Sequence, residues 1–184
     1  MGTKIITRGM VAVMAGIIMF TIGSSRAWAQ VPAEIAEAMK KLQGLAGEWE
    51  GKATIVMGGE TINFTLHHTT TRIADGLGLQ IIESASIPGL GAYSAVNLLG
   101  YDAGGNQFHI YSVTSDGYSH DHKGSWSSGN TITFIYEGPD PDGKRFVETV
   151  PLTLKGTNEY HFESYITLDG ADAGTFSATM KRKR

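Results

Sequence analysis

Two histidines within one short stretch, residues 118–126, are the strongest chemical feature of this chain. Successive side chains of a β-strand point to opposite faces, so the stretch divides into two sets. One set is polar and suits solvent: Ser119, Asp121, Lys123 and Ser125. The other set is aromatic or carries imidazole: Tyr118, His120, His122 and Trp126. If Trp126 faces a core, His120 and His122 face it too.

Adjacent imidazoles on one face suit zinc or another borderline metal. Such a site needs a third ligand, and no close spacing in the sequence supplies one for His120 and His122. Burying Asp121 and Lys123 unpaired would cost far more than burying neutral imidazoles. We therefore predict that both histidines point inward, either as ligands of a bound molecule or metal or as hydrogen-bonded core residues.

Further polar residues share the apolar faces of other predicted strands. Pairing Arg72 with Leu79 around the turn pair Asp75-Gly76 sets His68 opposite Glu83, within reach of a hydrogen bond. Pairing Trp126 with Ile132 places Tyr136 beside His122 and makes Glu148 a diagonal neighbour. The candidate ligand-binding set is His68, Arg72, Glu83, His120, His122, Trp126, Tyr136 and Glu148, with His120 and His122 as candidate metal ligands.

Structural alternatives stand beside these roles. A polar pair such as His68 and Glu83 also serves as a clamp within a core, because buried polar groups are nearly always hydrogen-bonded. His67 and His109 fall on mixed or polar faces, so surface positions are expected for them.

The elements that position these residues are strands, after a single helix. Residues 32–43 have a helical apolar stripe, with Pro32 at the start and Gly44 after the end. From Gly47 onward the apolar period is two, and turn pairs such as Gly58-Gly59 separate about ten strands. The predicted strands are 47–55, 61–73, 79–87, 93–101, 108–114, 118–126, 131–137, 145–154, 160–168 and 175–182.

Hairpin-linked strands with one apolar face form a sandwich or a barrel, and closure into a barrel removes both exposed edges. We predict an all-β fold, an antiparallel up-and-down barrel of about ten strands over residues 47–182. A barrel of this strand number is wide enough to hold a cavity unless large side chains fill it.

The first 29 residues have the features of a secretory signal peptide. Lys4 and Arg8 precede an apolar run too short for a comfortable membrane span, and Ala27-Trp28-Ala29 is a small-x-small cleavage site. The mature chain, residues 30–184, is predicted to be one domain without a membrane span. The chain has no cysteine, which suits an oxidising compartment such as a bacterial periplasm. We expect a periplasmic or secreted protein.

The charge balance argues against nucleic acid as a partner. The predicted signal peptide holds three of the fifteen basic residues and none of the eighteen acidic ones, so its removal lowers the formal charge from −3 to −6. A mildly acidic domain without a basic stripe lacks the electrostatic footprint of nucleic-acid binding.

Four motifs in order carry a family resemblance: Gly47-Glu48-Trp49-Glu50-Gly51, Arg72-Ile73-Ala74-Asp75-Gly76, Leu99-Gly100-Tyr101-Asp102, and the stretch from His120 to Trp126. Together they resemble a family of secreted bacterial lipocalin-like β-barrels known only as a domain of unknown function. The resemblance implies a fold and an export route, and no chemistry. By analogy with lipocalins, in which an arginine closes one barrel end, Arg72 is also suited to stacking over Trp49. Gly47-x-Trp49-x-Gly51 is also similar to the nitrobindin-type haem barrels, whose proximal histidine lies late in the chain, near the position of His161.

The sequence has no nucleophile, phosphate-loop or dinucleotide-binding motif. Our first hypothesis is therefore an exported barrel that binds a small, largely apolar ligand in its interior. The alternative is a metal- or haem-dependent enzyme that uses His120 and His122. A further alternative is a structural or partner-binding barrel with a filled core. Zinc, haem or no cofactor all remain open, as does the oligomeric state.

Overall fold

The computed structural model describes residues 33–184 of the chain. The predicted signal peptide, its cleavage site after Ala29 and the first predicted helical residue, Pro32, lie outside the described residues. Within the described part no helix combines the length and the apolar character needed to cross a membrane.

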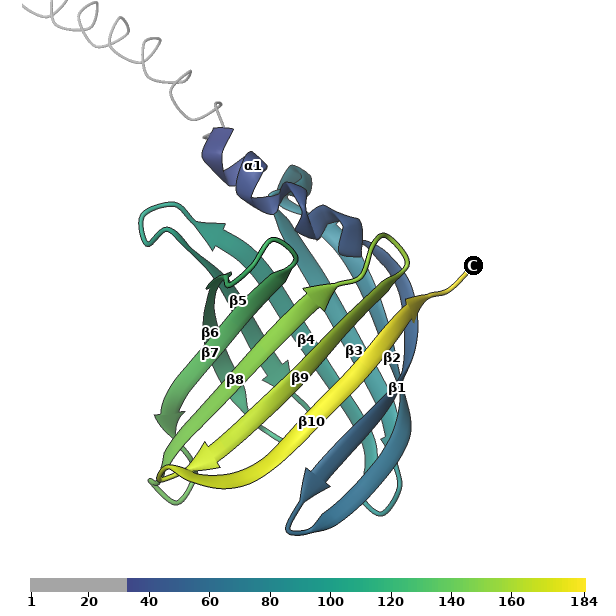
Figure 1. Cartoon of the computed structure of the whole chain (residues 1–184), viewed down its shortest axis with the longest axis vertical. Coiled ribbons are helices and arrows are strands. Elements are labelled where there is room, and N and C mark those ends of the chain that lie inside the picture. The colour runs from purple at the N-terminus through teal and green to yellow at the C-terminus, as the bar shows by residue number, and fades with distance from the viewer. Residues whose placement is uncertain (1–32) are drawn as a thin grey trace, which may run out of the picture. The chain divides into compact units, whose positions relative to one another are not determined.

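Ten antiparallel strands form a closed barrel in which each strand pairs with its neighbours in sequence, and β1 pairs with β10 (Figure 1). The strands are β1 (Gly47–Met57), β2 (Glu60–Ile73), β3 (Gly78–Ile87), β4 (Gly91–Asp102), β5 (Gln107–Thr114), β6 (Ser119–Trp126), β7 (Thr131–Pro139), β8 (Arg145–Leu154), β9 (Glu159–Leu168) and β10 (Ala171–Arg182). The predicted up-and-down barrel is confirmed, and the sandwich alternative is wrong.

Alternation along the strands sets the inside of the barrel, as the sequence pattern indicated. In β1, Trp49, Gly51 and Ala53 are buried, whereas Glu50 and Lys52 between them are exposed. The turn after β2 has Ala74 and Asp75 at positive φ within the short 3₁₀ segment η2 (Ala74–Gly76). This turn pairs Arg72 with Leu79 and His68 with Glu83, as predicted. The predicted pair Trp126 and Ile132 is also present.

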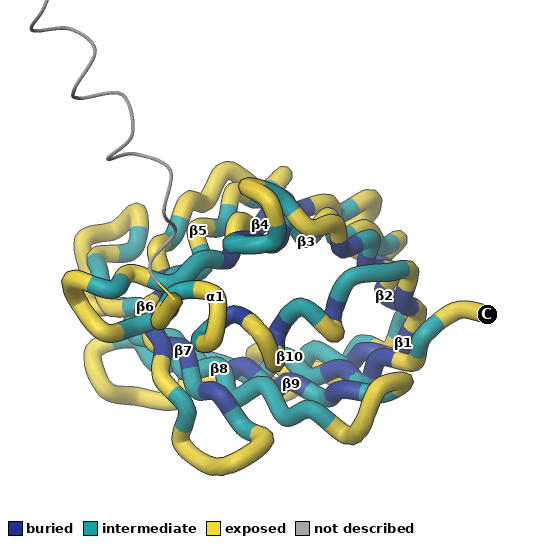
Figure 2. Tube along the Cα trace, turned by 90° about the horizontal axis from the view of Figure 1, so that it is seen from above, coloured by how far each residue is buried: buried dark blue, intermediate teal, exposed yellow. Residues whose placement is uncertain are grey.

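One end of the barrel is covered by the helical segment that precedes β1 (Figures 1 and 2). The helix α1 (Ala33–Lys40) is shorter than the predicted range 32–43, because the chain tightens into the 3₁₀ turn η1 (Leu42–Leu45). Met39, Leu42 and Leu45 are buried and join the main core cluster. The segment is therefore a plug fixed to the barrel by its apolar stripe.

Candidate functional site

A cavity of about 200 Å³ lies inside the barrel. Most of its wall is apolar or aromatic, and polar side chains occupy a smaller part of it. The lining residues are Leu45, His68, Thr70, Ile81, Glu83, Tyr93, Asn97, Ile110, Ser112, Thr114, His120, His122, Phe134, Glu148, Val150, Leu152, Tyr160, Phe162, Ser164 and Phe176. An apolar cavity with a few convergent polar groups is the usual form of a small-molecule site.

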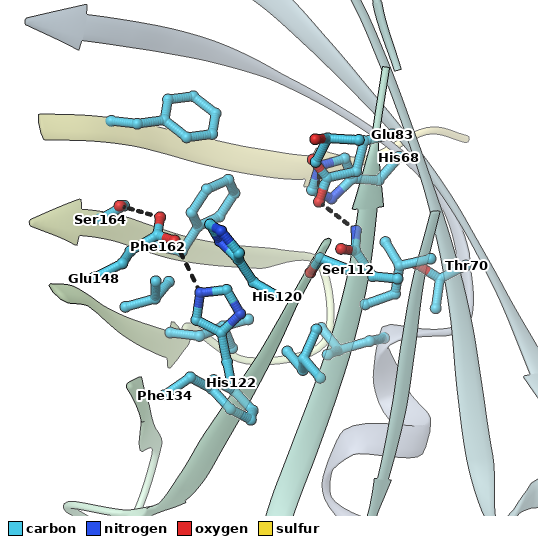
Figure 3. A pocket seen from close by; sticks show the side chains of 18 of the residues that line it. His68, Thr70, Glu83, Ser112, His120, His122, Phe134, Glu148, Phe162 and Ser164 are labelled. Carbon is cyan, nitrogen blue, oxygen red and sulfur yellow. Dashed lines mark hydrogen bonds and ion pairs between the residues drawn. The ribbon is translucent and has the colours of Figure 1, made fainter. Parts of the chain in front are cut away.

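Two clusters of polar side chains lie on different walls of this cavity (Figure 3). The first, called here the His68 cluster, consists of His68 on β2, Glu83 on β3, Asn97 on β4 and Tyr160 on β9. His68 Nδ1 is hydrogen-bonded to the Tyr160 hydroxyl at 2.6 Å, and the Asn97 amide donates to Glu83 Oε1 at 2.8 Å. His68 Nε2 and Glu83 Oε1 are 3.6 Å apart, beyond an ordinary hydrogen bond.

Burial decides the protonation of the His68 cluster. Desolvation lowers the pKa of His68 from 6.5 to about 4, so the imidazole is neutral at pH 7. Desolvation raises the pKa of Glu83 from 4.5 to about 7, although the hydrogen bond from Asn97 opposes the rise. Glu83 therefore exchanges its proton near neutral pH, which is unusual for a carboxyl group.

The second group, called here the His122 cluster, consists of His120 and His122 on β6, Glu148 on β8 and Ser164 on β9. His122 Nε2 donates to Glu148 Oε2 at 2.8 Å, and the Ser164 hydroxyl donates to Glu148 Oε1. Burial alone would raise the pKa of Glu148, but these two hydrogen bonds and the neighbouring imidazoles hold it below its usual value. Glu148 is therefore an ionised acceptor at neutral pH.

His120 is held in place by aromatic neighbours. Its ring stacks on Tyr136 with 3.9 Å between ring centroids, and Phe146 lies 5.3 Å away. Tyr136 can lie along β7 because residue 138 is glycine, since a β-carbon there would overlap the Tyr136 hydroxyl. Burial lowers the pKa of His120.

Two ring nitrogens of these clusters have no hydrogen-bond partner among the described residues. They are His68 Nε2 and His122 Nδ1, and both are enclosed by the surrounding side chains. A ring nitrogen of histidine either donates or accepts a hydrogen bond, so each of these two atoms can serve a further partner. Buried polar atoms without a partner are uncommon and call for an explanation.

Most of the predicted site residues meet in this cavity. His68, Glu83, His120, His122 and Glu148 all line it. Glu148 contacts His122 directly, so the diagonal neighbour expected from the strand pairing is present. Tyr136 lies behind His120 and is not itself part of the lining.

Two predicted site residues lie elsewhere. Arg72 is exposed and donates to the Gln43 carbonyl oxygen at 3.3 Å, so the prediction that it lines the interior is wrong. A guanidinium is costly to bury without a partner, and this one lies at the strand end where water and a carbonyl are in reach. The arginine that stacks over Trp49 is Arg182, with its guanidinium 4.2 Å from the ring centroid. Trp126 is only half-buried, packs against Phe108 and lies beneath the Lys41 ammonium group, away from the cavity.

The remaining histidines are outside the cavity lining. His67 is exposed beside Glu50, and His109 pairs with Asp121 on the outer face, as expected. His161 is hydrogen-bonded to Thr179, on the face of β9 opposite to Tyr160, Phe162 and Ser164. His161 is therefore not placed to act as a ligand inside the cavity.

Several lining residues were not among the predicted site residues: Tyr93, Asn97, Tyr160 and Ser164. Strand alternation carries the signal for two of them. Ser164 shares a face with Phe162, and Asn97 shares one with Leu99, so both are polar positions on apolar faces. Their shortness and lack of charge made them inconspicuous.

The fold and the site together define a closed ten-stranded barrel of the lipocalin-like kind, with an internal, mainly apolar cavity. The chain belongs to the family described as protein of unknown function (DUF1579), whose model matches residues 35–182. A comparison with curated proteins found no match.

Solved structures of similar fold include an S-type phycobiliprotein lyase, CPES, from Guillardia theta. It has a TM-score of 0.55 and 11% identity over 83% of this chain and 96% of the lyase. Two further structures match with TM-scores too low to argue from. That of EF1p2_mFAP2b bound to DFHBI has a TM-score of 0.38 and 12% identity over 79% and 99% of the two chains. A DUF1329 family protein from Desulfovibrio piger has a TM-score of 0.32 and 10% identity over 82% and 91%. At these identities the likeness to the lyase concerns the fold alone.

Proposed function

We propose that this protein binds a small, largely apolar and uncharged molecule inside its barrel. The observation that carries this proposal is the cavity of about 200 Å³ with mainly apolar walls and two separate polar clusters. A barrel whose only task was structural would fill this space with side chains, because voids in a protein interior destabilise it.

The size of the cavity limits the ligand. An engineered apolar cavity of about 150 Å³ in another protein binds benzene. At about 200 Å³, this cavity suits a molecule of one or two rings, or a short branched chain, better than a long acyl chain. The rings of Phe134, Phe162 and Phe176 favour flat or aromatic partners.

The charges of the wall limit the ligand further. The described lining residues include two carboxyl groups, Glu83 and Glu148, and no lysine or arginine. With Arg72 outside, no permanent cation can meet a ligand carboxylate, and an unpaired anion in an apolar site is costly. The ligand we propose therefore bears a neutral polar group, such as a hydroxyl, that meets the histidine and glutamate side chains.

Calorimetric titration at pH 7 with 2-naphthol and with 2-naphthoate tests the proposal, because the two differ mainly in the charge of the polar group. The buffer contains a chelator, so that no metal ion is bound to the protein during the titration. We expect 2-naphthol to bind, and 2-naphthoate to bind at least about tenfold more weakly because its carboxylate loses hydration without gaining a cation.

A matched pair of variants on β8 locates the binding. Val150→Phe adds volume to the cavity wall, whereas Val147→Phe adds the same volume on the opposite face of the strand. Binding should be lost in the first variant and kept in the second. Absence of naphthol binding by the folded wild type, or equal binding by both variants, would instead favour the barrel with a filled, structural interior.

We also propose that the protein is exported, on the strength of the basic start, apolar run and Ala27-Trp28-Ala29 cleavage motif. Expression of the whole chain in a bacterium and N-terminal sequencing of periplasmic or secreted protein provide the test. The mature protein should begin at Gln30. Residues 1–29 still attached in the exported protein would contradict the proposal.

A further inference from the structure

We infer that the His122 cluster is a binding site for a divalent transition-metal ion, with His120, His122 and Glu148 as the protein ligands. The inference is independent of the apolar ligand proposed above, since it rests on three side chains of one wall. The sequence alone showed no third metal ligand for the two histidines of β6, and in the structure Glu148 lies in that position.

The fold brings the three ligands together from two strands, β6 and β8, which lie on either side of β7. His120 and His122 are two residues apart on β6, so both point into the barrel, and Glu148 reaches them from β8 across β7. One ligand atom from each of the three residues lies within 4.8 Å of the other two. Figure 3 shows the two imidazoles and the carboxylate converging on one side of the cavity.

The donor set suits zinc and its neighbours in the first transition row. Two imidazole nitrogens and one carboxylate oxygen form the three-ligand set found at zinc sites that keep a fourth position for water or another molecule. A hard ion such as magnesium prefers oxygen ligands and is a poor match for two imidazoles.

The surroundings hold the ligands in position, as the neighbours of metal ligands usually do. Ser164 donates to the carboxylate oxygen of Glu148 that does not contact His122. The ring of His120 is fixed by stacking on Tyr136. His122 is 7% exposed, and its Nδ1 has no partner among the described residues. The described residues thus leave one ring nitrogen of His122 without a hydrogen bond.

Titration of the purified full-length protein with cobalt(II) tests the inference, because cobalt in a tetrahedral site of this kind gives visible absorption bands. No naphthol is present, so this result and the result of the ligand titration are separate. We expect one cobalt ion per chain, displacement of cobalt by zinc, and a rise in melting temperature with zinc concentration, since an ion that binds only the folded state stabilises it.

Three variants locate the metal. His120→Ala and Glu148→Gln should each weaken cobalt binding by more than about tenfold. Loss of a residue that only supports a metal ligand already weakens binding by about that factor, and these two residues are ligands themselves. His109→Ala should bind as the wild type does, because His109 pairs with Asp121 on the outer face of the barrel. Circular dichroism shows whether each variant is folded. Two ligand variants are used so that, if one of them does not fold, the other still tests the site.

Failure of the folded wild type to bind cobalt or zinc would overturn the inference. Binding that survives in both His120→Ala and Glu148→Gln would overturn it as well, because the metal would then lie elsewhere. Loss of binding in His109→Ala together with retention in Glu148→Gln would place the metal on the outer face.

Discussion

The two histidine–glutamate pairs of the cavity show how neighbours set the protonation of the same two residue types. Glu148 accepts hydrogen bonds from His122 and Ser164, which stabilise its ionised form. Glu83 receives one hydrogen bond, from Asn97, and His68 stays 3.6 Å away. Desolvation therefore prevails at Glu83 and raises its pKa to about 7. Glu148 therefore stays ionised, whereas Glu83 exchanges a proton near neutrality.

The His68 cluster predicts opposing effects of pH on stability. The folded pKa of Glu83 is about 7 against 4.5 in the unfolded chain, so stability is lost as the pH rises from about 4.5 to 7. The folded pKa of His68 is about 4 against 6.5, so stability is lost as the pH falls from about 6.5 to 4. Each effect amounts to at most about 3 kcal/mol at about 1.4 kcal/mol per pKa unit.

Single substitutions should separate these effects in urea denaturation between pH 4.5 and 6.5. Glu83→Gln removes the falling contribution, so its free energy of unfolding should rise more steeply with pH than that of the wild type. His68→Asn removes the rising contribution, so its free energy of unfolding should fall with pH relative to the wild type. If both variants follow the wild-type pH profile, neither group has a shifted pKa in the folded protein.

Much of the candidate site was predictable from strand parity and from pairing around short turns. These two rules placed His68 opposite Glu83 and brought Glu148 to His122. They failed at Arg72, because parity gives the face of a strand but not where along the barrel wall a long side chain ends. They also left Ser164 and Asn97 unnoticed, since short uncharged residues resemble ordinary core positions.

At the scale of elements, the pairing between β6 and β7 is the shortest between neighbouring strands of the barrel. Its pairing with β5 covers residues 119–124, but its pairing with β7 covers only residues 123–126. The rest of β7, from Tyr136 to Pro139, pairs with β8 alone. His120 and Tyr136, whose rings stack on each other, both belong to the parts of β6 and β7 that are not paired with one another. Backbone groups at such a seam behave like those of an edge strand.

The seam predicts fast amide hydrogen exchange in one half of β6. Peptides covering residues 119–122 should exchange at least about tenfold faster than peptides covering residues 66–70, because locally open segments have lower protection than fully paired ones. Residues 66–70 belong to β2 and pair on both sides, with β1 and with β3. Mass spectrometry of quenched digests provides the measurement. Equal protection of the two segments would show that β6 and β7 stay joined in solution.

At the scale of the whole molecule, closure depends on bringing the last strand back to the first. Trp49 on β1 pairs with Arg182 at the end of β10. Trp49 is 2% exposed, donates from its indole nitrogen to the Leu45 carbonyl at 2.8 Å, and contacts Tyr160 edge to face. The barrel as a class was evident from the alternating strands, but the residue that completes its closure was not. The sequence indicated an arginine over Trp49, and only the strand pairing shows that it is Arg182 rather than Arg72.

The half-buried Arg182 is predicted to stabilise this closure more than a neighbouring exposed charge does. Its guanidinium lies over the Trp49 ring and donates to the Ala46 and Gly44 carbonyl oxygens at 2.8 and 2.6 Å, and its Nε donates to the Thr157 carbonyl at 3.1 Å. Arg182→Ala should lower the free energy of unfolding by about 2–4 kcal/mol, because hydrogen bonds to a charged group and a cation–π contact are lost together.

The neighbouring residue provides the control. Lys183 lies 3.8 Å from Glu50 in an exposed ion pair, so Lys183→Ala should lower the free energy of unfolding by less than about 1 kcal/mol. Urea denaturation of both variants, followed by tryptophan fluorescence, measures the difference. Similar losses in the two variants would mean that the barrel closes through its backbone pairing alone, without help from the arginine.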